Sequence, residues 1–397
     1  MEDFSRPIPS VFVATPGALT PTGGGVQICT HEYVRGLELA GFGLSPISYS
    51  PDRRLRKRLA NRLLPTVYPV LWKPSFIPEL LKFIEQERAE FVFLNLVSFG
   101  RLIQPLRAAL SNRVKLVVLS HGLESVDYVH ALRIQARWGR TGPKSLWSGP
   151  RKLSRQLIEE MRQREFIDQV ICLAPFEAEI ERWLGARAVG WLPRTVPRDA
   201  GLLWKPIPNR FGFVGTLDHP PNYEAVQVVC SEFARCQIDG FEMRLVGGPA
   251  RIGQSLTSRY PFVTYLGSLS DSELESEAAS WTGFLHPLFC YARGCSTKLA
   301  IGLKWQLPII TTPEGCRGYV WESGELPMAR SASEFVNLVR RLADLTIAAK
   351  VREQVIQVAK SGPTMEQVGG ALRRMLLNPG NPPAWRADRS ELHSQSP

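Results

Sequence analysis

The sequence lacks the cysteine arrangements that build metal sites or small disulfide-linked folds. Its seven cysteines are scattered over 397 residues, and no two of them form a C-x-x-C pair. No group of Cys and His has the spacing of zinc ligands. We therefore interpret the cysteines as reduced thiols of a cytoplasmic protein, and we expect no metal ion and no cofactor.

Long apolar runs are missing as well. The longest nearly apolar stretch, Phe91–Phe99, has about half of the roughly 20 residues that a transmembrane helix needs. The first residues, Met1–Pro9, are polar and acidic rather than typical of a signal peptide. We therefore expect a protein that does not cross a membrane, while contact with a membrane surface stays open.

The composition is typical of a globular protein with two domains. Apolar residues make up 44% of the chain and charged residues 21%, and 397 residues exceed the length of one ordinary domain. The net charge of +11 is concentrated, because residues 51–150 hold 17 Lys and Arg against 7 Asp and Glu, a net charge of +10. Such a positive region suits the phosphates of lipids, nucleic acids or a diphosphate ligand.

Short apolar runs alternate with amphipathic patterns in both halves of the chain. In the first half the predicted strands are Ser10–Thr15, Leu44–Tyr49, Phe91–Leu96, Lys115–Ser120, Gln169–Ala174 and Ala188–Leu192. In the second half they are Arg210–Gly215, Phe241–Val246, Val263–Leu266, Gly283–Leu285 and Pro308–Thr312. Helical patterns such as Val26–Ala40 and Thr297–Trp305 lie between them. Each half therefore predicts a parallel sheet covered by helices on both faces.

The predicted fold class is α/β, with two Rossmann-like domains. The segment Pro193–Pro208 holds four prolines and little periodicity, which is typical of a linker. The expected parts are a domain over 1–193, a linker over 194–208, a domain over 209–360, a cross-over helix over 361–377 and a disordered tail over 378–397.

Two motifs suit phosphate groups. Glycines 23–25 separate the first strand from the first helix and let backbone N–H groups approach a ligand, although a flexible connector has the same composition. Lys298 lies in the first turn of a predicted helix that Ser296 or Thr297 can cap. A cation at that end is unfavourable unless an anion binds in front of it. A solvated lysine on an ordinary helix is the alternative.

Several stretches in order resemble the family 4 retaining glycosyltransferases, which have the GT-B fold. They include Phe211–Asn222 (FGFVGTLDHPPN), Leu245–Gly248 (LVGG), Val263–Leu274 (VTYLGSLSDSEL), Gly294–Gly318 and, in the first half, Ser120–Glu124 (SHGLE). The resemblance spans roughly residues 10–375. It implies two domains that face each other across a cleft, with the last helices crossing back to the first domain.

The resemblance also implies roles for individual residues. The expected donor-binding residues are Gly24, Gly25, Gly215, Thr216, Gly247, Ser268, Leu269, Gly294, Ser296, Thr297 and Lys298. His121 is expected beside the transferred sugar. Glu124 follows it closely in sequence and, apart from the resemblance, is a candidate for orienting the acceptor hydroxyl. Because the family holds the departing diphosphate with fixed donors and a lysine, no metal is expected.

The chain departs from the family at its two glutamates. Aligned on Lys298 and Pro308, their positions hold Arg293 and Ile301. Isoleucine accepts no hydrogen bonds from ribose hydroxyls, whereas Arg293 is hypothesised to supply positive charge to the phosphates as a catalytic residue. His121 lies after an apolar run, where such sheets place ligands, but a structural histidine is the alternative. Glu124 fits equally well as a first-turn acid of a helix.

Two basic regions, residues 53–72 and 131–155, contain most of the excess charge. The second interleaves arginines and lysines with Trp138 and Trp147, a composition that suits an anionic membrane surface. A solvated basic face is the alternative. The sequence contains no recognised nucleic-acid module, so no nucleic-acid partner is expected.

We interpret the chain as a hexosyltransferase that moves a sugar from a nucleotide-sugar donor, with retention, to a glycan or lipid-linked acceptor in bacterial-type polysaccharide or glycoconjugate assembly. It is expected in the cytoplasm, or peripheral at the cytoplasmic face of the membrane. Two alternatives stay open. One is a non-catalytic GT-B partner subunit, suggested by the missing glutamates, and the other is a nucleic-acid-binding protein, suggested by charge alone.

Overall fold

The computed structural model describes residues 6–20, 24–50, 72–99, 101–137, 143–198, 201–237, 240–379 and 385, with only the backbone for 143–147. The chain forms two compact units. Unit 1 comprises Met1–Pro193 and Thr364–Pro397, and unit 2 comprises Arg194–Pro363. Most of the predicted tail and nearly all of the basic region 53–72 lie outside the described residues.

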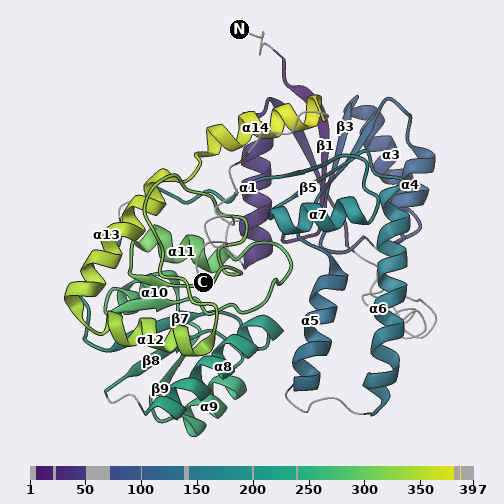
Figure 1. Ribbon diagram of the computed structural model, residues 1–397. Coiled ribbons are helices and arrows are strands. Elements are labelled where there is room, and N and C mark those ends of the chain that lie inside the picture. Colours follow the sequence, from purple (N-terminus) through teal and green to yellow (C-terminus); the bar gives the residue numbers. More distant parts are fainter. Residues whose placement is uncertain are drawn as a thin grey trace, which may run out of the picture. The chain divides into compact units, whose positions relative to one another are not determined.

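Unit 1 contains a six-stranded parallel sheet (Figure 1). Its strands are β1 (Ile8–Ala14), β2 (Phe42–Ser48), β3 (Phe91–Asn95), β4 (Lys115–Leu119), β5 (Gln169–Cys172) and β6 (Val189–Trp191). Their order in the sheet is β2-β1-β3-β4-β5-β6. The order reverses between β1 and β3, and sheets of this kind bind ligands at the carboxyl ends of the strands at that point.

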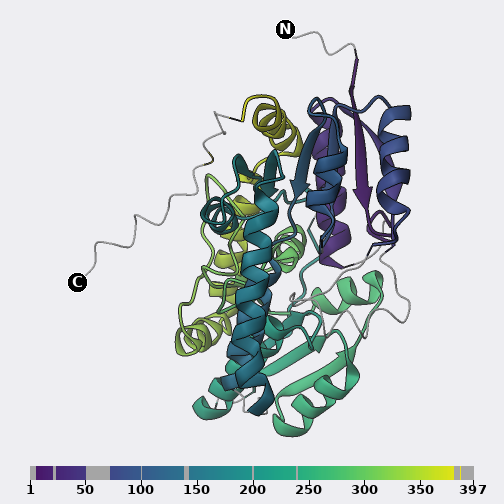
Figure 2. The ribbon, with the colours of Figure 1, turned by 90° about the vertical axis from the view of Figure 1, so that its right-hand side faces the viewer.

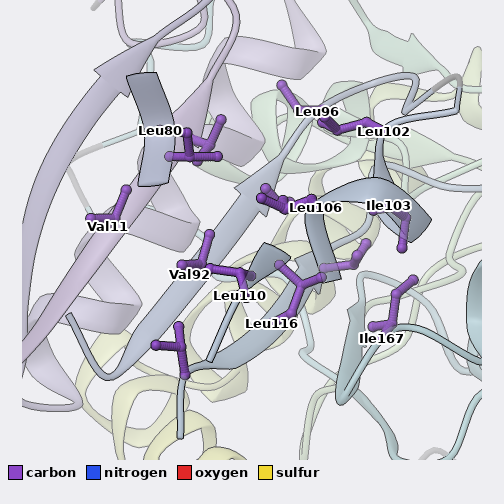
Figure 3. Packing of buried hydrophobic residues seen from close by; sticks show 14 of the residues in the cluster. Val11, Leu80, Val92, Leu96, Leu102, Ile103, Leu106, Leu110, Leu116 and Ile167 are labelled. Atoms are coloured by element: carbon purple, nitrogen blue, oxygen red, sulfur yellow. The ribbon is translucent and has the colours of Figure 1, made fainter. Parts of the chain in front are cut away.

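Helices cover both faces of this sheet (Figure 2). They are α1 (Gly25–Leu39), α3 (Phe76–Gln86), α4 (Ile103–Ala109), α5 (Glu124–Arg137), α6 (Pro143–Arg164), α7 (Pro175–Trp183) and α14 (Met365–Leu377). Leu80 of α3 and Leu106 of α4 pack with Val11 of β1 and Val92 of β3 in one buried cluster (Figure 3). Strand side chains alternate between faces, and their burial excludes water from both.

The last helix, α14, belongs to unit 1 and packs against α1. The two helices approach closely at Gly369 of α14, where a Cβ atom would lie 2.6 Å from the Leu39 Cβ atom of α1. The Gln169 side chain of β5 donates a hydrogen bond to the Met375 carbonyl at 2.9 Å. The expected return of the chain to the first domain is therefore confirmed, and this return fixes the end of the chain on the first sheet.

Unit 2 repeats the architecture with a five-stranded parallel sheet in the order β11-β10-β7-β8-β9. Its strands are β7 (Arg210–Val214), β8 (Glu242–Val246), β9 (Val263–Gly267), β10 (Gly283–Leu285) and β11 (Ile309–Ile310). Its helices are α8 (Pro220–Cys236), α9 (Ala250–Arg259), α10 (Asp271–Ala278), α11 (Thr297–Trp305), α12 (Ala332–Leu342) and α13 (Leu345–Ser361). The order reverses between β7 and β10, which places the expected ligand end there.

The segment interpreted as a linker is built into unit 2. Leu202 N–H donates to the Trp305 carbonyl at 3.0 Å, and Lys205 N–H donates to the Ala279 carbonyl at 2.8 Å. The Trp204 indole donates to the Trp281 carbonyl at 2.7 Å. These bonds attach an irregular, proline-rich segment that has no strand or helix periodicity of its own.

Candidate functional site

The predicted donor-binding residues of unit 2 gather at the carboxyl ends of its strands. Gly215 follows β7, Gly247 follows β8 and Ser268 follows β9. A Cβ atom on Gly247 would lie 2.0 Å from the Gly215 carbonyl oxygen, and Gly247 has φ +127°. Both the close approach and the positive φ require glycine. The two glycines therefore keep this edge of the sheet open as bare backbone.

Lys298 reaches this edge from the first turn of α11. Its Nζ donates to Asn222 Oδ1 at 2.8 Å, and Asn222 Nδ2 donates to the Thr216 carbonyl at 2.8 Å. A Cβ atom on Gly215 would lie 2.6 Å from Lys298 Cε, so glycine leaves the space that the lysine side chain occupies. The sequence analysis quoted Asn222 only as part of a motif, whereas the structure makes it the residue that holds the ammonium group.

The surroundings of Lys298 are electropositive. Burial, and next the charge of Arg317, lower the pKa of Lys298 to about 8. Within the described part of the chain, neither side chain forms an ion pair with a carboxylate. A partly buried ammonium group next to another cation is stabilised by a bound anion. The start of α11 is thus suited to phosphate oxygens.

The loop before α11 is held by His286, which follows β10. His286 is fully buried, with Nε2 2.7 Å from Ser296 Oγ and Nδ1 2.9 Å from Thr311 Oγ1. Burial, then the charges of Lys298 and Arg317, keep the pKa of His286 well below its usual value, so the ring is neutral. No local pattern in the sequence indicates this role, because the two partners of His286 lie 10 and 25 residues further along the chain.

Ser296 occupies the N-cap position of α11, but its side chain makes no capping hydrogen bond. Of the two predicted capping residues, Ser296 therefore does not cap the helix, because its hydroxyl contacts His286 instead. Tyr319 OH donates to the Ser296 carbonyl and accepts from Ala300 N–H at 3.0 Å. The backbone amides of Thr297 and Lys298 lie in the first turn of α11, at the positive end of the helix dipole.

Arg317 clamps the same loop from the other side. Its guanidinium donates to the carbonyls of Gly294 at 2.8 Å, Glu314 at 2.8 Å and Arg293 at 3.5 Å. Arg317 is 7% exposed, and its partners among the described residues are three carbonyl groups and no carboxylate. It fixes the loop and adds positive potential to the site. No motif in the sequence distinguishes it from a surface arginine.

The remaining predicted positions of unit 2 differ in character. Leu269 packs partly buried against the apolar cluster around Trp281. Ile301, at the position of a family glutamate, packs against the same cluster. Its side chain serves packing, so this position offers no hydrogen-bond acceptor to a ligand.

The other predicted residues belong to unit 1. Gly24 and Gly25 are exposed at the start of α1, where no side chain caps the helix. His121 follows β4 and is 7% exposed, and its Nε2 lies 2.9 Å from Asn95 Oδ1 at the end of β3. These residues lie at the ligand end that the strand order of unit 1 indicates.

A polar pocket adjoins His121 in unit 1. It is lined by Ser120, Gly122, Glu124, Gln156, Glu160 and Gln163, among others. Glu160 Oε1 accepts from Ser125 N–H and from Gln156 Nε2, both at 3.1 Å. Glu124 is 8% exposed in the first turn of α5. The cavity has a volume of about 30 Å³, room for about one water molecule, and Arg164 and Glu181 add to its polar lining.

The second basic region forms a pair of long helices, α5 and α6, that lie side by side (Figure 1). Residues 138–142 between them, Trp138 included, lie outside the described residues. Arg137, Arg151, Lys152 and Arg155 are exposed, and the chain contains no Asp or Glu between Asp127 and Glu159. Among the helices described, none is long and apolar enough to span a membrane.

Comparisons with known proteins bear on the family and on the fold. Residues 208–344 match the family model described as Glycosyl transferases group 1, and that segment contains Gly215, Asn222, His286, Lys298 and Arg317. Residues 208–344 resemble the group 1 glycosyltransferases. No curated protein matches the chain in sequence.

The chain also resembles solved structures over almost its whole length. HepE of Anabaena, solved with UDP and glucose, is 12% identical, and the alignment covers 94% of this chain and 100% of HepE with TM-score 0.56. WaaG, a glycosyltransferase involved in lipopolysaccharide biosynthesis, is 12% identical over 93% and 100%, with TM-score 0.57. An O-GlcNAc transferase mutant of Thermobaculum terrenum is 14% identical over 95% and 67%, with TM-score 0.53. The fold is GT-B, as the sequence predicts.

Proposed function

We propose that this GT-B protein transfers a hexose from a nucleotide-sugar donor, with retention of anomeric configuration. The observation that carries the proposal is Lys298, a partly buried cation at the start of α11 with an amide as its hydrogen-bond partner. When the bond from the anomeric carbon to the diphosphate breaks, negative charge builds on the diphosphate. Lys298 and the N-terminal amides of α11 stabilise that charge more than they stabilise the bound donor.

The acceptor in this proposal contributes a hydroxyl group. Its oxygen bonds to the anomeric carbon on the face that the diphosphate leaves, and its proton departs with the diphosphate. A hydroxyl-rich acceptor, such as a glycan or a lipid-linked saccharide, is the class that the resemblance to the family implies. The transfer needs no metal and no cofactor, since Lys298 and backbone N–H groups supply the positive charge.

The setting we propose is the cytoplasmic face of a membrane. The exposed basic residues of α5 and α6, without acidic neighbours in sequence, support binding to anionic lipids. All seven cysteines are free, which supports a reducing compartment. A lipid-linked acceptor lies at such a surface, so membrane contact and acceptor choice support one another. Assembly of a bacterial-type polysaccharide or glycoconjugate fits both.

The test is a panel of nucleotide sugars incubated with the purified protein, alone and with candidate acceptors. We expect one donor to release its nucleoside diphosphate, and we expect the product to keep the anomeric configuration in NMR spectra. The non-catalytic alternative predicts diphosphate binding without hydrolysis or transfer. The nucleic-acid alternative predicts tight, strongly salt-dependent binding of oligonucleotides instead.

A further inference from the structure

The serine at the N-cap position of α11 is kept from capping its own helix. A serine at this position normally accepts a hydrogen bond from the second or third amide of the helix. Ser296 has the extended backbone of an N-cap residue, with φ −80° and ψ 114°, but its side chain makes no capping hydrogen bond. Its hydroxyl instead lies 2.7 Å from His286 Nε2. The local sequence therefore favours a cap that His286 prevents.

The His286 ring is anchored on the side that faces away from Ser296. Its Nδ1 lies 2.9 Å from Thr311 Oγ1, and both residues are fully buried. Gly315 leaves room for the ring, because a Cβ atom there would lie 2.8 Å from His286 Nδ1. A hydroxyl both donates and accepts, so either tautomer of the neutral ring makes both hydrogen bonds. The contact with Ser296 is therefore independent of which ring nitrogen carries the proton.

The withdrawn hydroxyl leaves the first amides of α11 open. The first N–H groups of a helix have no partner within the helix. Among the described residues, no acceptor pairs with the N–H groups of Thr297, Lys298 or Leu299. The next amide, of Ala300, donates to the Tyr319 hydroxyl at 3.0 Å. The open amides lie at the positive end of the helix dipole, together with the ammonium group of Lys298.

We propose that His286 is a positioning residue that withdraws Ser296 from capping, so that the first amides of α11 stay open to the phosphate oxygens of the donor. The phosphate in this inference rests on the proposed function, whereas the withdrawn cap does not. An internal cap and a bound phosphate compete for the same N–H groups. His286 is fully buried, so it acts through Ser296 and not by contact with the donor.

Two substitutions of His286 separate the two contacts of its ring. In His286→Gln, the side-chain amide reaches the position of Nε2 and still holds the Ser296 hydroxyl. In His286→Asn, the shorter side chain places its amide at the position of Nδ1, beside Thr311, and Ser296 is released to cap α11. Titration calorimetry uses whichever of UDP, GDP, ADP and TDP binds the wild-type protein most tightly. His286→Asn should weaken this binding by about 5- to 30-fold, the strength of a helix cap, and His286→Gln should bind nearly as the wild-type protein does.

A second substitution distinguishes this role from packing alone. Ser296→Ala removes the competing hydroxyl, so the double variant His286→Asn/Ser296→Ala should bind the diphosphate more tightly than His286→Asn, by about fivefold or more. A histidine that only fills space predicts no recovery, because a second truncation in the same buried cluster adds to the damage. His286→Asn/Ser231→Ala is the matched control and should bind as His286→Asn does. Ser231 lies on α8, with its hydroxyl 3.0 Å from Tyr260 OH.

Hydrogen-exchange NMR reads the cap without any ligand. The Lys298 and Leu299 amides should exchange more slowly in His286→Asn than in His286→Asn/Ser296→Ala, by about fivefold or more, because only the first variant has the capping hydroxyl. Ser296→Ala in the wild-type background should leave both exchange rates unchanged, since the hydroxyl caps nothing there. This last comparison stands even where His286→Asn does not fold.

Three results would overturn the proposal. The first is faster exchange of the two amides in Ser296→Ala than in the wild-type protein, which would indicate a capping serine. The second is equal exchange in His286→Asn and the double variant, and the third is a double variant that binds the diphosphate no more tightly than His286→Asn. Failure of the proposed function is distinct, because it would appear as a wild-type protein that binds none of the four diphosphates, and the exchange rates would still decide the role of His286.

Discussion

The two units place different chemistry at the same position of the same architecture. In unit 2, the strand ends carry Lys298 and Arg317, whose partners are amide and carbonyl oxygens. In unit 1, the strand ends carry Asn95 and His121, and Glu124 follows in the first turn of α5. A cationic site with no carboxylate partner among the described residues suits a diphosphate, whereas amides and carboxylates suit hydroxyl groups. This difference supports the proposal that the donor binds to unit 2 and the acceptor to unit 1.

The largest expected effect comes from removing the cation of unit 2. Lys298→Met should lower kcat/KM for the nucleotide-sugar donor by about 10²–10³-fold, because a fixed charge stabilises the departing diphosphate. Steady-state kinetics with the donor found in the panel measure the loss. Lys304→Met, on the last turn of the same helix with a side chain 39% exposed, is the matched control and should leave kcat/KM unchanged. Equal losses in both variants would contradict the role of Lys298.

The next effect concerns the basic helices of unit 1. Replacing Arg151 and Lys152 with glutamine should weaken binding to vesicles of phosphatidylglycerol and phosphatidylcholine by about 30-fold, at about 1 kcal/mol for each basic residue. The matched double variant of Arg340 and Arg341, on α12 of unit 2, should bind as the wild-type protein does. Co-sedimentation at low salt measures both. Equal binding by all three proteins would show that the basic face of α6 is simply solvated.

The third effect is a pH dependence of the affinity for the nucleoside diphosphate at the proposed site in unit 2. The pKa of Lys298 is lowered to about 8, so its ammonium group is present below pH 8 and is lost above it. Bound phosphate favours the charged form, and binding above pH 8 therefore requires proton uptake. Affinity for the nucleoside diphosphate should fall by up to about tenfold per pH unit above 8. Titration calorimetry in buffers of different ionisation enthalpy measures it, and Lys298→Met should lack this dependence.

The smallest effect is expected at Arg293. If its charge reaches the phosphates, Arg293→Ala should raise the donor KM or lower kcat by about 3- to 10-fold, which corresponds to one solvent-screened contact. Arg235→Ala is the control. Arg235 lies in the last turn of α8 and forms an ion pair with Glu232 at 2.6 Å. An unchanged rate for Arg293→Ala would remove this residue from the mechanism and leave Lys298 and Arg317 as the cations of the site.

The sequence predicted both parallel sheets and the position of Lys298, because apolar periodicity and helix-end chemistry are local properties. It did not predict the partners that hold the site. Asn222 contacts Lys298 across 76 residues, and Asn95 contacts Thr30 across 65. Such hydrogen bonds depend on how strands are ordered, which no local pattern encodes.

The capping expectation at Ser296 failed for the same reason. A serine before a helix normally bonds to the N-terminal amides, but a buried histidine ten residues earlier offers a competing partner. The α5–α6 pair was interpreted only as a basic region, because α6 contains Pro150 and a polar composition. Its helices are held by contacts with each other.

The most direct test of the account is the thermal stability of the wild-type protein and Lys298→Met with UDP, GDP, ADP and TDP in parallel. A ligand that binds only the folded state raises Tm. We predict that at least one of the four raises the Tm of the wild-type protein in a concentration-dependent way and has little effect on Lys298→Met. An unchanged Tm with all four diphosphates, or an equal rise in both proteins, would contradict a donor site at Lys298.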